Sequence, residues 1–347
     1  MSKKENISEE VMSDAAIEAM IGAAKSVGAD EATAIPEDHQ CGYVGLVGRP
    51  NVGKSTLLNR ILGEKVSIIS RKPQTTRNRV VGIWNTDSVQ AIMVDTPGHH
   101  EARAALNKAL VREAEAALSD VDVVSFIVDV VPAAAQARKG RPIFSKGEEV
   151  LLERIKSSGK PAVLVLNKID TIEVKWLLPV IEAWKELHDF AAIIPISALN
   201  GESVDKLLDT LVGYLPEHPP LFPKDQLVDG TEKFIVSEII REKMFHHLSK
   251  ELPYSVAVII ESFDESNREG QKGTKPRVKI GARIIVERKS QRGIVIGKGG
   301  SMIKTIGTEA RKELIGLLGC KVHLDLYVSI EKDWTKSPRV LRQLGFE

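Results

Sequence analysis

Eight residues give the strongest indication of this chain's fold, Gly48-Arg49-Pro50-Asn51-Val52-Gly53-Lys54-Ser55. They match the pattern G-x-x-x-x-G-K-[ST], a loop whose backbone N–H groups wrap around a polyphosphate. An apolar run at 42–47 predicts a buried strand before the loop, and residues 56–62 predict a helix after it. The helix N-terminus adds partial positive charge, Lys54 reaches the β- and γ-phosphates, and Ser55 binds Mg²⁺. The alternative is a chance Gly-rich turn, which the strand, loop and helix context disfavours.

A second motif predicts which base the nucleotide carries. Asn167-Lys168-Ile169-Asp170 follows the apolar run 161–166, which predicts another buried strand. The Asp170 carboxylate would accept hydrogen bonds from guanine N1–H and the exocyclic amine, whereas adenine would leave it unpaired. Such a mismatch can reject a ligand by roughly 10⁴-fold. We therefore expect GTP and GDP as ligands, with Asn167 and Lys168 bracing the loop and covering the base, and an ATPase or a nucleotide kinase is disfavoured.

Two more loops complete the predicted nucleotide site. Asp95-Thr96-Pro97-Gly98 follows a strand predicted at 88–94. Asp95 would hold Mg²⁺ through a water molecule, and the Gly98 N–H would sense the γ-phosphate. Ser197-Ala198-Leu199 follows a further apolar strand and would pack on the guanine edge. Loops in this order predict an α/β fold of the Ras-like doubly wound type, with the site at the carboxyl ends of the parallel strands.

The polar segment 70–77 lies between these loops and is predicted to be a nucleotide-dependent switch. We expect residues 67–79 and 95–103 to become ordered when γ-phosphate and Mg²⁺ are bound. Either Thr75 or Thr76 would complete the Mg²⁺ shell, and we favour Thr76. An ordinary surface loop before the next strand is the alternative.

These motifs resemble a known group of GTPases. P-N-V-G-K-S-T-L-L-N at 50–59, Q-T-T-R at 74–77 and D-T-P-G at 95–98 are similar to the Era, Der and MnmE group. In that group the asparagine of the phosphate loop, here Asn51, is associated with a bound K⁺ that stands in for an arginine finger, and the resemblance implies this role. The single phosphate loop argues against the tandem GTPase domains of the Der pattern. No cis arginine finger is evident, so we expect slow intrinsic hydrolysis.

The residue after Gly98 leaves two interpretations open. Ras-type GTPases carry there the glutamine that orients the attacking water, and Era-like proteins usually carry an apolar residue. This chain has His99, followed by His100. Translational GTPases of the elongation-factor type place a histidine at this position, so His99 could orient water. Alternatively, His99 is a mobile switch residue without a catalytic role.

A second domain is predicted after a proline-rich segment. Four prolines within eight residues, at 216, 219, 220 and 223, favour a semi-rigid linker. The order that follows is helix, strand, strand, helix, helix and strand, which is typical of an α+β KH domain of type II. The predicted elements are a helix at 232–248, strands at 254–262 and 277–287, a short helix, a helix at 303–318 and a strand at 322–329.

The turn between the last two helices carries an RNA-binding signal. Ile296-Gly297-Lys298-Gly299-Gly300 is an I-G-x-x-G, in which two glycines bring backbone N–H groups against about four single-stranded nucleotides and Lys298 adds charge. Lys304 follows in the next helix. Ile294 and Val295, with Ile296, would form an apolar floor for unstacked bases, and some of the three must also belong to the core. An ordinary helix-helix turn is the alternative, and the basic surroundings and the element order disfavour it.

Charge is distributed unevenly along the 347 residues, although 48 basic residues nearly balance 47 acidic ones. The first 40 residues carry nine acids and three lysines and predict a partly disordered tail. Residues 268–312 carry thirteen basic side chains against three acidic ones, which indicates a nucleic-acid partner. The charged, Gly-rich insertion at 264–279 predicts a solvated loop, with an extra RNA contact as the alternative.

Cysteine usage and hydropathy predict the compartment. Cys41 and Cys320 are far apart and lack metal-ligand spacing, which favours a reducing compartment over a disulfide framework. No stretch approaches the roughly 20 apolar residues of a membrane span, and the N-terminus lacks a secretory pattern. We expect a cytoplasmic protein.

The second domain narrows the resemblance to the Era family. Residues 232–243 and 251–256 resemble the start of the KH domain in that family, so the resemblance covers roughly residues 42–347. It implies binding to the 3′ end of 16S rRNA, a role in assembling the 30S ribosomal subunit, and peripheral association with the inner face of the cell membrane. We also expect a monomer. The predicted parts are a tail at 1–40, a GTPase domain at 41–215, a linker at 216–224 and a KH domain at 225–347.

We interpret the chain as a GTP-hydrolysing switch coupled to rRNA binding that acts in 16S rRNA processing. The alternative is an RNA-binding assembly placeholder in which the nucleotide is mainly structural. The candidate catalytic residues are Lys54, Thr76, Gly98 and His99, and the Mg²⁺ ligands are Ser55, Thr76 and Asp95. The candidate nucleotide-binding residues are Gly48, Asn51, Val52, Gly53, Lys54, Ser55, Thr56, Asp95, Gly98, Asn167, Lys168, Asp170, Ser197, Ala198 and Leu199. The candidate RNA-binding residues are Ile296, Gly297, Lys298, Gly299, Gly300 and Lys304.

Overall fold

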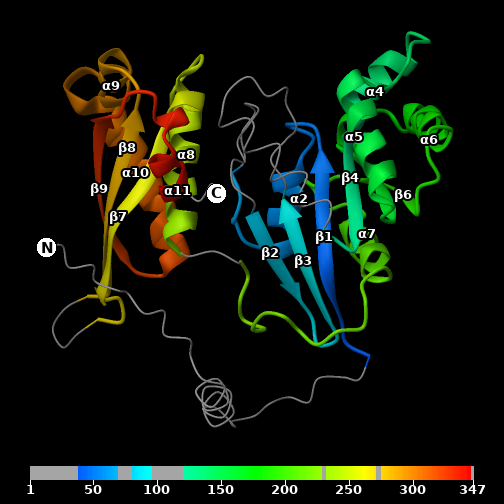
Figure 1. The fold of residues 1–347 in the computed structure, drawn as a ribbon, viewed down its shortest axis with the longest axis horizontal. Coiled ribbons are helices and arrows are strands. Elements are labelled where there is room, and N and C mark those ends of the chain that lie inside the picture. Colours follow the sequence, from blue (N-terminus) through cyan, green and yellow to red (C-terminus); the bar gives the residue numbers. More distant parts are fainter. Residues whose placement is uncertain (1–37, 69–79, 96–119, 229–231, 271–274, 345–347) are drawn as a thin grey trace, which may run out of the picture. The chain divides into compact units, whose positions relative to one another are not determined.

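The structure, a computed structural model, describes residues 38–68, 80–95, 120–228, 232–270 and 275–344. Two β-sheets, one of six strands and one of three, organise these residues (Figure 1). Three of the predicted catalytic residues, Thr76, Gly98 and His99, lie outside the described residues, as does the predicted N-terminal tail up to residue 37.

The six-stranded sheet has the strand order β2-β3-β1-β4-β5-β6. Its strands are nearly continuous apolar runs because both faces of the sheet are covered. All neighbouring pairs are parallel except β2 and β3, which are antiparallel at one edge. The strands are β1 (Gln40–Gly48), β2 (Val80–Asn85), β3 (Val89–Asp95), β4 (Val123–Asp129), β5 (Ala162–Asn167) and β6 (Ala192–Ile196).

Helices cover both faces of this sheet, as the doubly wound prediction requires (Figure 1). Successive residues of a strand point to opposite faces, so Ile127 of β4 packs in one core while Phe126 and Val128 pack in the other. The first core takes its helical residues from α2 (Lys54–Leu62) and α7 (Val204–Val212). The second takes them from α4 (Val130–Ala137), α5 (Lys146–Ser158) and α6 (Leu177–Lys185).

The three-stranded sheet is mixed, with β8 antiparallel to β7 and parallel to β9. Three helices cover one face and share a single core with it. Alternate strand residues, including Ala257 and Ile285, point to the other face and pack against Trp334 and Val340 from the C-terminal segment. The elements are α8 (Glu232–His247), β7 (Ala257–Asn267), β8 (Arg277–Val286), α9 (Lys289–Ile296), α10 (Ser301–Leu318), β9 (Lys321–Ile330) and α11 (Pro338–Gln343). This is the predicted order of helix, strand, strand, helix, helix and strand.

Two sequence predictions in this part of the chain need correction. Strand β7 begins at Ala257 rather than at residue 254, because Leu252–Ser255 forms a 3-10 turn that contains a proline. The predicted solvated loop at 264–279 is wrong at both ends, since Asp264 pairs with Lys279 and the two strands continue as a hairpin. Cross-strand hydrogen bonding satisfies backbone groups that composition alone suggested were solvated.

The proline-rich segment follows the open edge of the first sheet. Gln90, fully buried on β3, accepts hydrogen bonds from the N–H groups of Leu221 and Phe222 at 2.7 and 2.9 Å. Its amide nitrogen donates to the Phe222 carbonyl at 2.8 Å. Farther along, the Ile83 N–H of β2 donates to the Leu227 carbonyl at 2.8 Å. The segment is therefore attached to the edge strand β2 and to its neighbour β3.

Candidate active site and nucleic-acid groove

The phosphate loop connects the end of β1 to the start of α2. Asn51 (φ 64°) and Gly53 (φ 106°) both adopt left-handed backbone conformations, which fold the loop back over the helix. Gly53 occupies the N-cap position, and α2 has no side-chain cap there. The N-terminal N–H groups of a helix capped by glycine carry partial positive charge toward the loop, as an anion site requires.

Lys54 holds its ammonium group inside this loop. The side chain is buried, and Nζ donates to the carbonyl oxygens of Gly48 at 2.9 Å and Arg49 at 3.2 Å. Burial lowers the pKa of Lys54, and the negative charge of Asp95 opposes that shift. A cation placed where a polyphosphate would bring negative charge is the arrangement that phosphate binding and transfer need.

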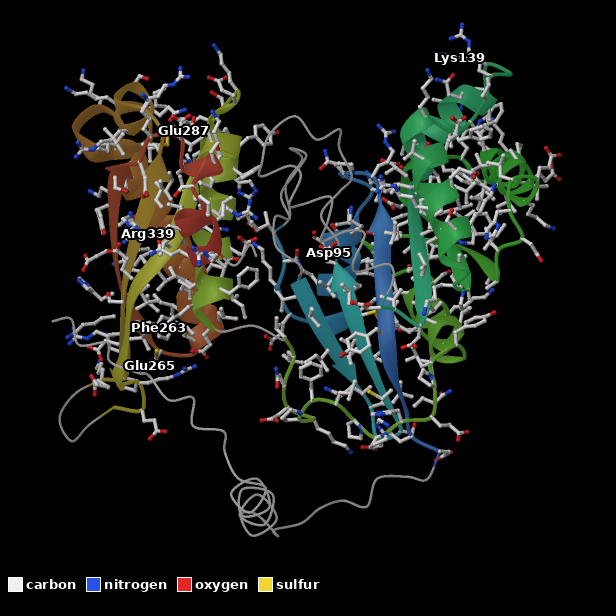
Figure 2. The ribbon with its side chains drawn as sticks, in the orientation of Figure 1. Asp95, Lys139, Phe263, Glu265, Glu287 and Arg339 are labelled. Carbon is white, nitrogen blue, oxygen red and sulfur yellow. The ribbon has the colours of Figure 1, made fainter. Side chains whose placement is uncertain are left out.

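The two described Mg²⁺ candidates lie next to each other. The Ser55 hydroxyl donates to Asp95 Oδ2 at 3.0 Å, although the residues are 40 positions apart. Asp95 lies at the end of β3 (Figure 2) and is fully buried, and the Ser67 hydroxyl also reaches its Oδ2, at 3.4 Å. A hydroxyl and a carboxylate are hard oxygen donors, which Mg²⁺ prefers. The residues present therefore fit a magnesium ion.

Asn167 joins three loops through its buried side-chain amide. Nδ2 donates to the Val52 carbonyl of the phosphate loop at 2.7 Å, and Oδ1 accepts from the Ala198 N–H at 3.0 Å. A Cβ atom added at Gly53 would lie 2.2 Å from Asn167 Nδ2, so only glycine leaves room for the amide. The second glycine of the loop motif is required by the base-reading loop as well as by the phosphates.

Lys168 and Asp170 lie nearer the surface, in the same base-reading loop as Asn167. Lys168 has a left-handed backbone (φ 72°), and its Nζ donates to the Asn51 carbonyl at 2.7 Å. Asp170 lies in a short 3-10 turn with an exposed side chain, as a residue that reads a ligand requires. In the third loop Leu199 is exposed, whereas Ala198 is buried. Ala198 thus serves the loop junction through its backbone N–H.

The structure also forms the predicted glycine-rich turn. Helix α9 ends at Ile296 and α10 begins at Ser301, with Gly297, Gly299 and Gly300 all at positive φ between them. A Cβ at Gly297 would lie 2.7 Å from the Met302 nitrogen. Glycine is therefore required for this tight approach of the two helices.

The structure divides the apolar residues beside this turn between surface and core, as predicted. Ile294 is 56% exposed and remains available to a ligand, but Val295 is fully buried in the core below the helices. Consecutive helical residues point about 100° apart, so the run of three apolar residues cannot share one face.

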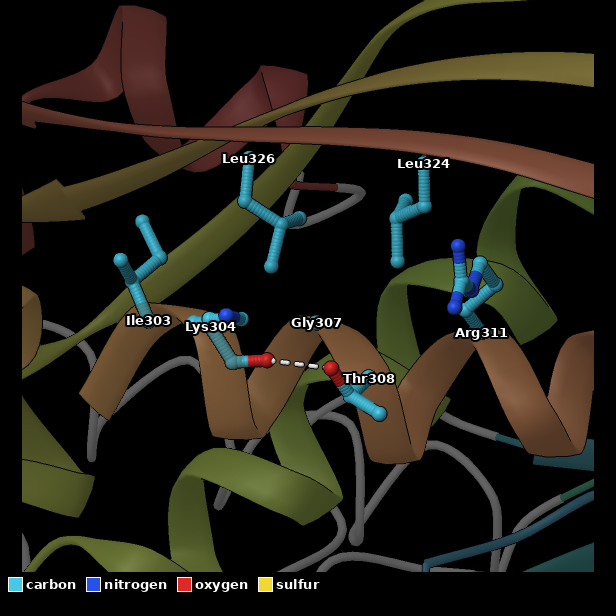
Figure 3. A pocket seen from close by; sticks show the side chains of 7 residues that line it. All are labelled: Ile303, Lys304, Gly307, Thr308, Arg311, Leu324 and Leu326. Atoms are coloured by element: carbon cyan, nitrogen blue, oxygen red, sulfur yellow. Dashed lines mark hydrogen bonds between the residues drawn. The ribbon is translucent and has the colours of Figure 1, made fainter. Parts of the chain in front are cut away.

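A groove of about 370 Å³ lies along α10 and β9 (Figure 3). The helix contributes Lys304 and Arg311, seven residues apart and therefore on the same face. The strand contributes Leu324 and Leu326, so apolar side chains face basic ones across the groove. The Thr308 hydroxyl donates to the Lys304 carbonyl at 2.8 Å and is held by its own helix. The lining residues are Ile303, Lys304, Gly307, Thr308, Arg311, Leu324 and Leu326.

Family comparisons agree with this pair of sites. Residues 43–168 match the family described as 50S ribosome-binding GTPase, and residues 251–335 match the KH domain family. The GTPase Era of Syntrophus aciditrophicus is 47% identical over 305 residues, which cover 88% of this chain and 94% of that protein. The GTPase Era of Geotalea uraniireducens is 46% identical over 306 residues, with 88% and 97% covered. This chain belongs to the Era family of GTPases.

Solved structures of Era have the same fold. An Era variant of Aquifex aeolicus bound to GDP and AlF₄⁻ is 40% identical, with a TM-score of 0.80 over 88% of this chain and 99% of that one. An Era complex with MgGDPNP and nucleotides 1506–1542 of 16S ribosomal RNA gives the same identity and TM-score over 89% and 99%. The predicted fold class, a Ras-like GTPase domain followed by a KH domain, is confirmed. The protein is a GTPase.

Part of each site in this Era-family chain was not predicted from the sequence. Asp129, at the end of β4, belongs to none of the predicted motifs, yet Lys168 Nζ lies 2.5 Å from its Oδ2. Its position directly after an apolar run was the available signal, the same one that marked Asn167. In the groove, the interior helical glycine Gly307 and the alternating leucines of β9 were signals without an assigned role.

Among the described residues, none of the helices has the length and apolar character needed to span a membrane.

Proposed function

We propose that this protein binds and hydrolyses GTP as a switch and binds the 3′ end of 16S rRNA through its KH domain, acting in 16S rRNA processing and 30S subunit assembly. The observation that carries the nucleotide part is the Asn167 amide, which ties the phosphate loop to both base-side loops. The phosphate loop and the two base-side loops are thereby held together by one side chain. The Era complex with MgGDPNP and 16S rRNA nucleotides supports the RNA part.

Each described residue has a distinct part in the proposed hydrolysis. Lys54 places its positive charge at the β- and γ-phosphates, while Asp170 accepts hydrogen bonds from guanine. Ser55 and Asp95 would hold Mg²⁺, which when bound neutralises charge on the phosphate oxygens. Thr76 is proposed as a further ligand, Gly98 as the γ-phosphate sensor and His99 as a candidate for orienting water. Asn51 is the proposed contact for K⁺.

The groove along α10 fits single-stranded RNA chemically. Lys298, Lys304 and Arg311 carry charge toward the sugar-phosphate chain, and the Gly297–Gly300 turn lets that chain approach the backbone. The leucines of β9 offer an apolar surface on which unstacked bases can lie. Direct electrostatic contacts of this kind predict RNA binding that weakens as salt rises.

The remaining expectations are part of the same proposal. The GTPase domain at 41–215, the linker at 216–224 and the KH domain at 225–347 would act as one monomer in the cytoplasm. Peripheral association with the inner face of the cell membrane is implied by the family and is proposed on that ground alone.

An Asp170→Asn substitution tests the guanine part of the proposal. Xanthine carries a carbonyl in place of the exocyclic amine, so the asparagine amide can donate to it while guanine loses one acceptor. We expect GDP affinity to fall by about a hundredfold or more and xanthosine diphosphate to become the better ligand. Fluorescent-nucleotide titration measures both. Unchanged preference for GDP would contradict the assignment of Asp170.

A further inference from the structure

Asp129 forms an ion pair with Lys168 of the base-reading motif. It ends β4 and pairs in register with Asn167 at the end of β5, so sheet geometry places it beside the base-reading motif. Its side chain is 21% exposed, and that of Lys168 is 34% exposed. The ion pair is therefore partly shielded from water.

The two carboxylate oxygens of Asp129 do different work. Oδ1 accepts from the Val131 N–H at 2.9 Å and caps the N-terminus of α4. Oδ2 accepts from Lys168 Nζ at 2.5 Å. One end of the carboxylate is fixed by the helix, so the other end offers Lys168 a fixed partner.

Lys168 passes this constraint to the phosphate loop. The same Nζ donates to the Asn51 carbonyl, and both Lys168 and Asn51 have positive φ values, which are uncommon for residues other than glycine. Backbone conformations of this kind persist at functional sites only where surrounding contacts fix them. The Lys168 ammonium therefore links the backbone of Asn51 to the base-reading loop, and Asp129 holds that ammonium in place.

We propose that Asp129 is a positioning residue of the nucleotide site, which sets affinity for the guanine nucleotide by holding Lys168 between the base-reading loop and the phosphate loop. This inference rests on the proposed function, because it concerns the same nucleotide. Asp129 acts through Lys168. Its loss should therefore affect mainly the rate at which nucleotide leaves, since a loosened loop releases ligand faster.

An Asp129→Ser substitution separates the two tasks of the carboxylate. Serine caps a helix about as well as aspartate but cannot reach Lys168 with a charge. We expect dissociation of fluorescent GDP from the full chain to become about tenfold faster, because the free energy of a hydrogen bond to a charged group corresponds to at least about a tenfold change. Asp129→Asn, which keeps the volume and one acceptor, should change the rate in the same direction. Glu153→Gln is the matched control, because it removes a paired carboxylate on α5, 70% exposed, and should leave the rate unchanged.

A double-mutant cycle with Lys168→Met distinguishes positioning from general stability. In the Lys168→Met background, Asp129→Ser should have little further effect, because its partner is already gone. Equal effects in both backgrounds, or a rate within twofold of the unaltered chain for both Asp129 variants, would overturn the inference. Failure of the unaltered chain to bind GDP would instead refute the proposed function.

Discussion

At the scale of single residues, the nucleotide site depends on the absence of a side chain at Gly53 and on the buried amide of Asn167. The Asn167 amide can reach Val52 and Ala198 only because Gly53 has no side chain. A buried amide that loses its partners costs about 1–3 kcal/mol, so an atom in this space would disturb three loops at once.

A Gly53→Ala substitution should therefore abolish most nucleotide affinity. The new methyl group would lie 2.2 Å from Asn167 Nδ2, and alanine is strained at φ 106°. We expect GDP affinity to fall by about a hundredfold, since strain and a displaced hydrogen bond together amount to about 3 kcal/mol. Isothermal titration calorimetry measures the affinity.

Gly63→Ala is the matched control for backbone strain. Gly63 also has positive φ, at 70°, but nothing lies within 4 Å of the position of its Cβ. This variant should lose some stability and keep its GDP affinity. If both variants bound GDP equally well, the junction at Asn167 would not control the site.

The motifs were predictable from sequence because each is a contiguous run with its own chemistry. The loop residues 48–55 and the run 167–170 needed only their flanking strands to be interpreted. Asp129 was not predictable in this way, because its partner Lys168 is 39 residues away and only strand order brings the two together. The burial of Val295 follows from helical geometry, which a run of apolar letters does not express.

At the scale of elements, the connection after α7 is attached to the first sheet by hydrogen bonds. Gln90 satisfies the backbone of Leu221 and Phe222, and Asn85 Nδ2 donates to the Lys224 carbonyl at 3.1 Å. An edge strand exposes unpaired backbone groups, and here the connection pairs with some of them. Prolines predicted a linker without regular structure, but they could not indicate that it would be attached to β2.

A Gln90→Met substitution should release this attachment. Methionine fills a similar volume but leaves the Leu221 and Phe222 N–H groups without their acceptor. We expect their amide hydrogens to exchange about tenfold faster or more, as the loss of one buried hydrogen bond implies. Hydrogen exchange read by mass spectrometry checks this, with strand β5 as the internal control. Unchanged exchange at 221–222 would contradict the anchoring role.

At the scale of the whole molecule, one chain carries a GTPase site and an RNA-binding groove. Strand β2 follows the predicted switch segment directly, and the connection that pairs with β2 continues toward α8, which begins at Glu232. A change of nucleotide that reorders the switch would therefore act on the element that precedes the KH domain. Such coupling typically changes affinity 5- to 150-fold and is reciprocal.

The measurement that tests this most directly is the affinity of the full chain for a 3′-terminal 16S rRNA fragment, with a non-hydrolysable GTP analogue and, separately, with GDP. We expect binding at least about fivefold tighter with the GTP analogue. The paired substitutions Lys304→Ala and Arg311→Ala should weaken it in both states, because they remove groove charges. Equal affinity in the two nucleotide states would contradict the switch and favour an RNA-binding placeholder whose nucleotide is structural.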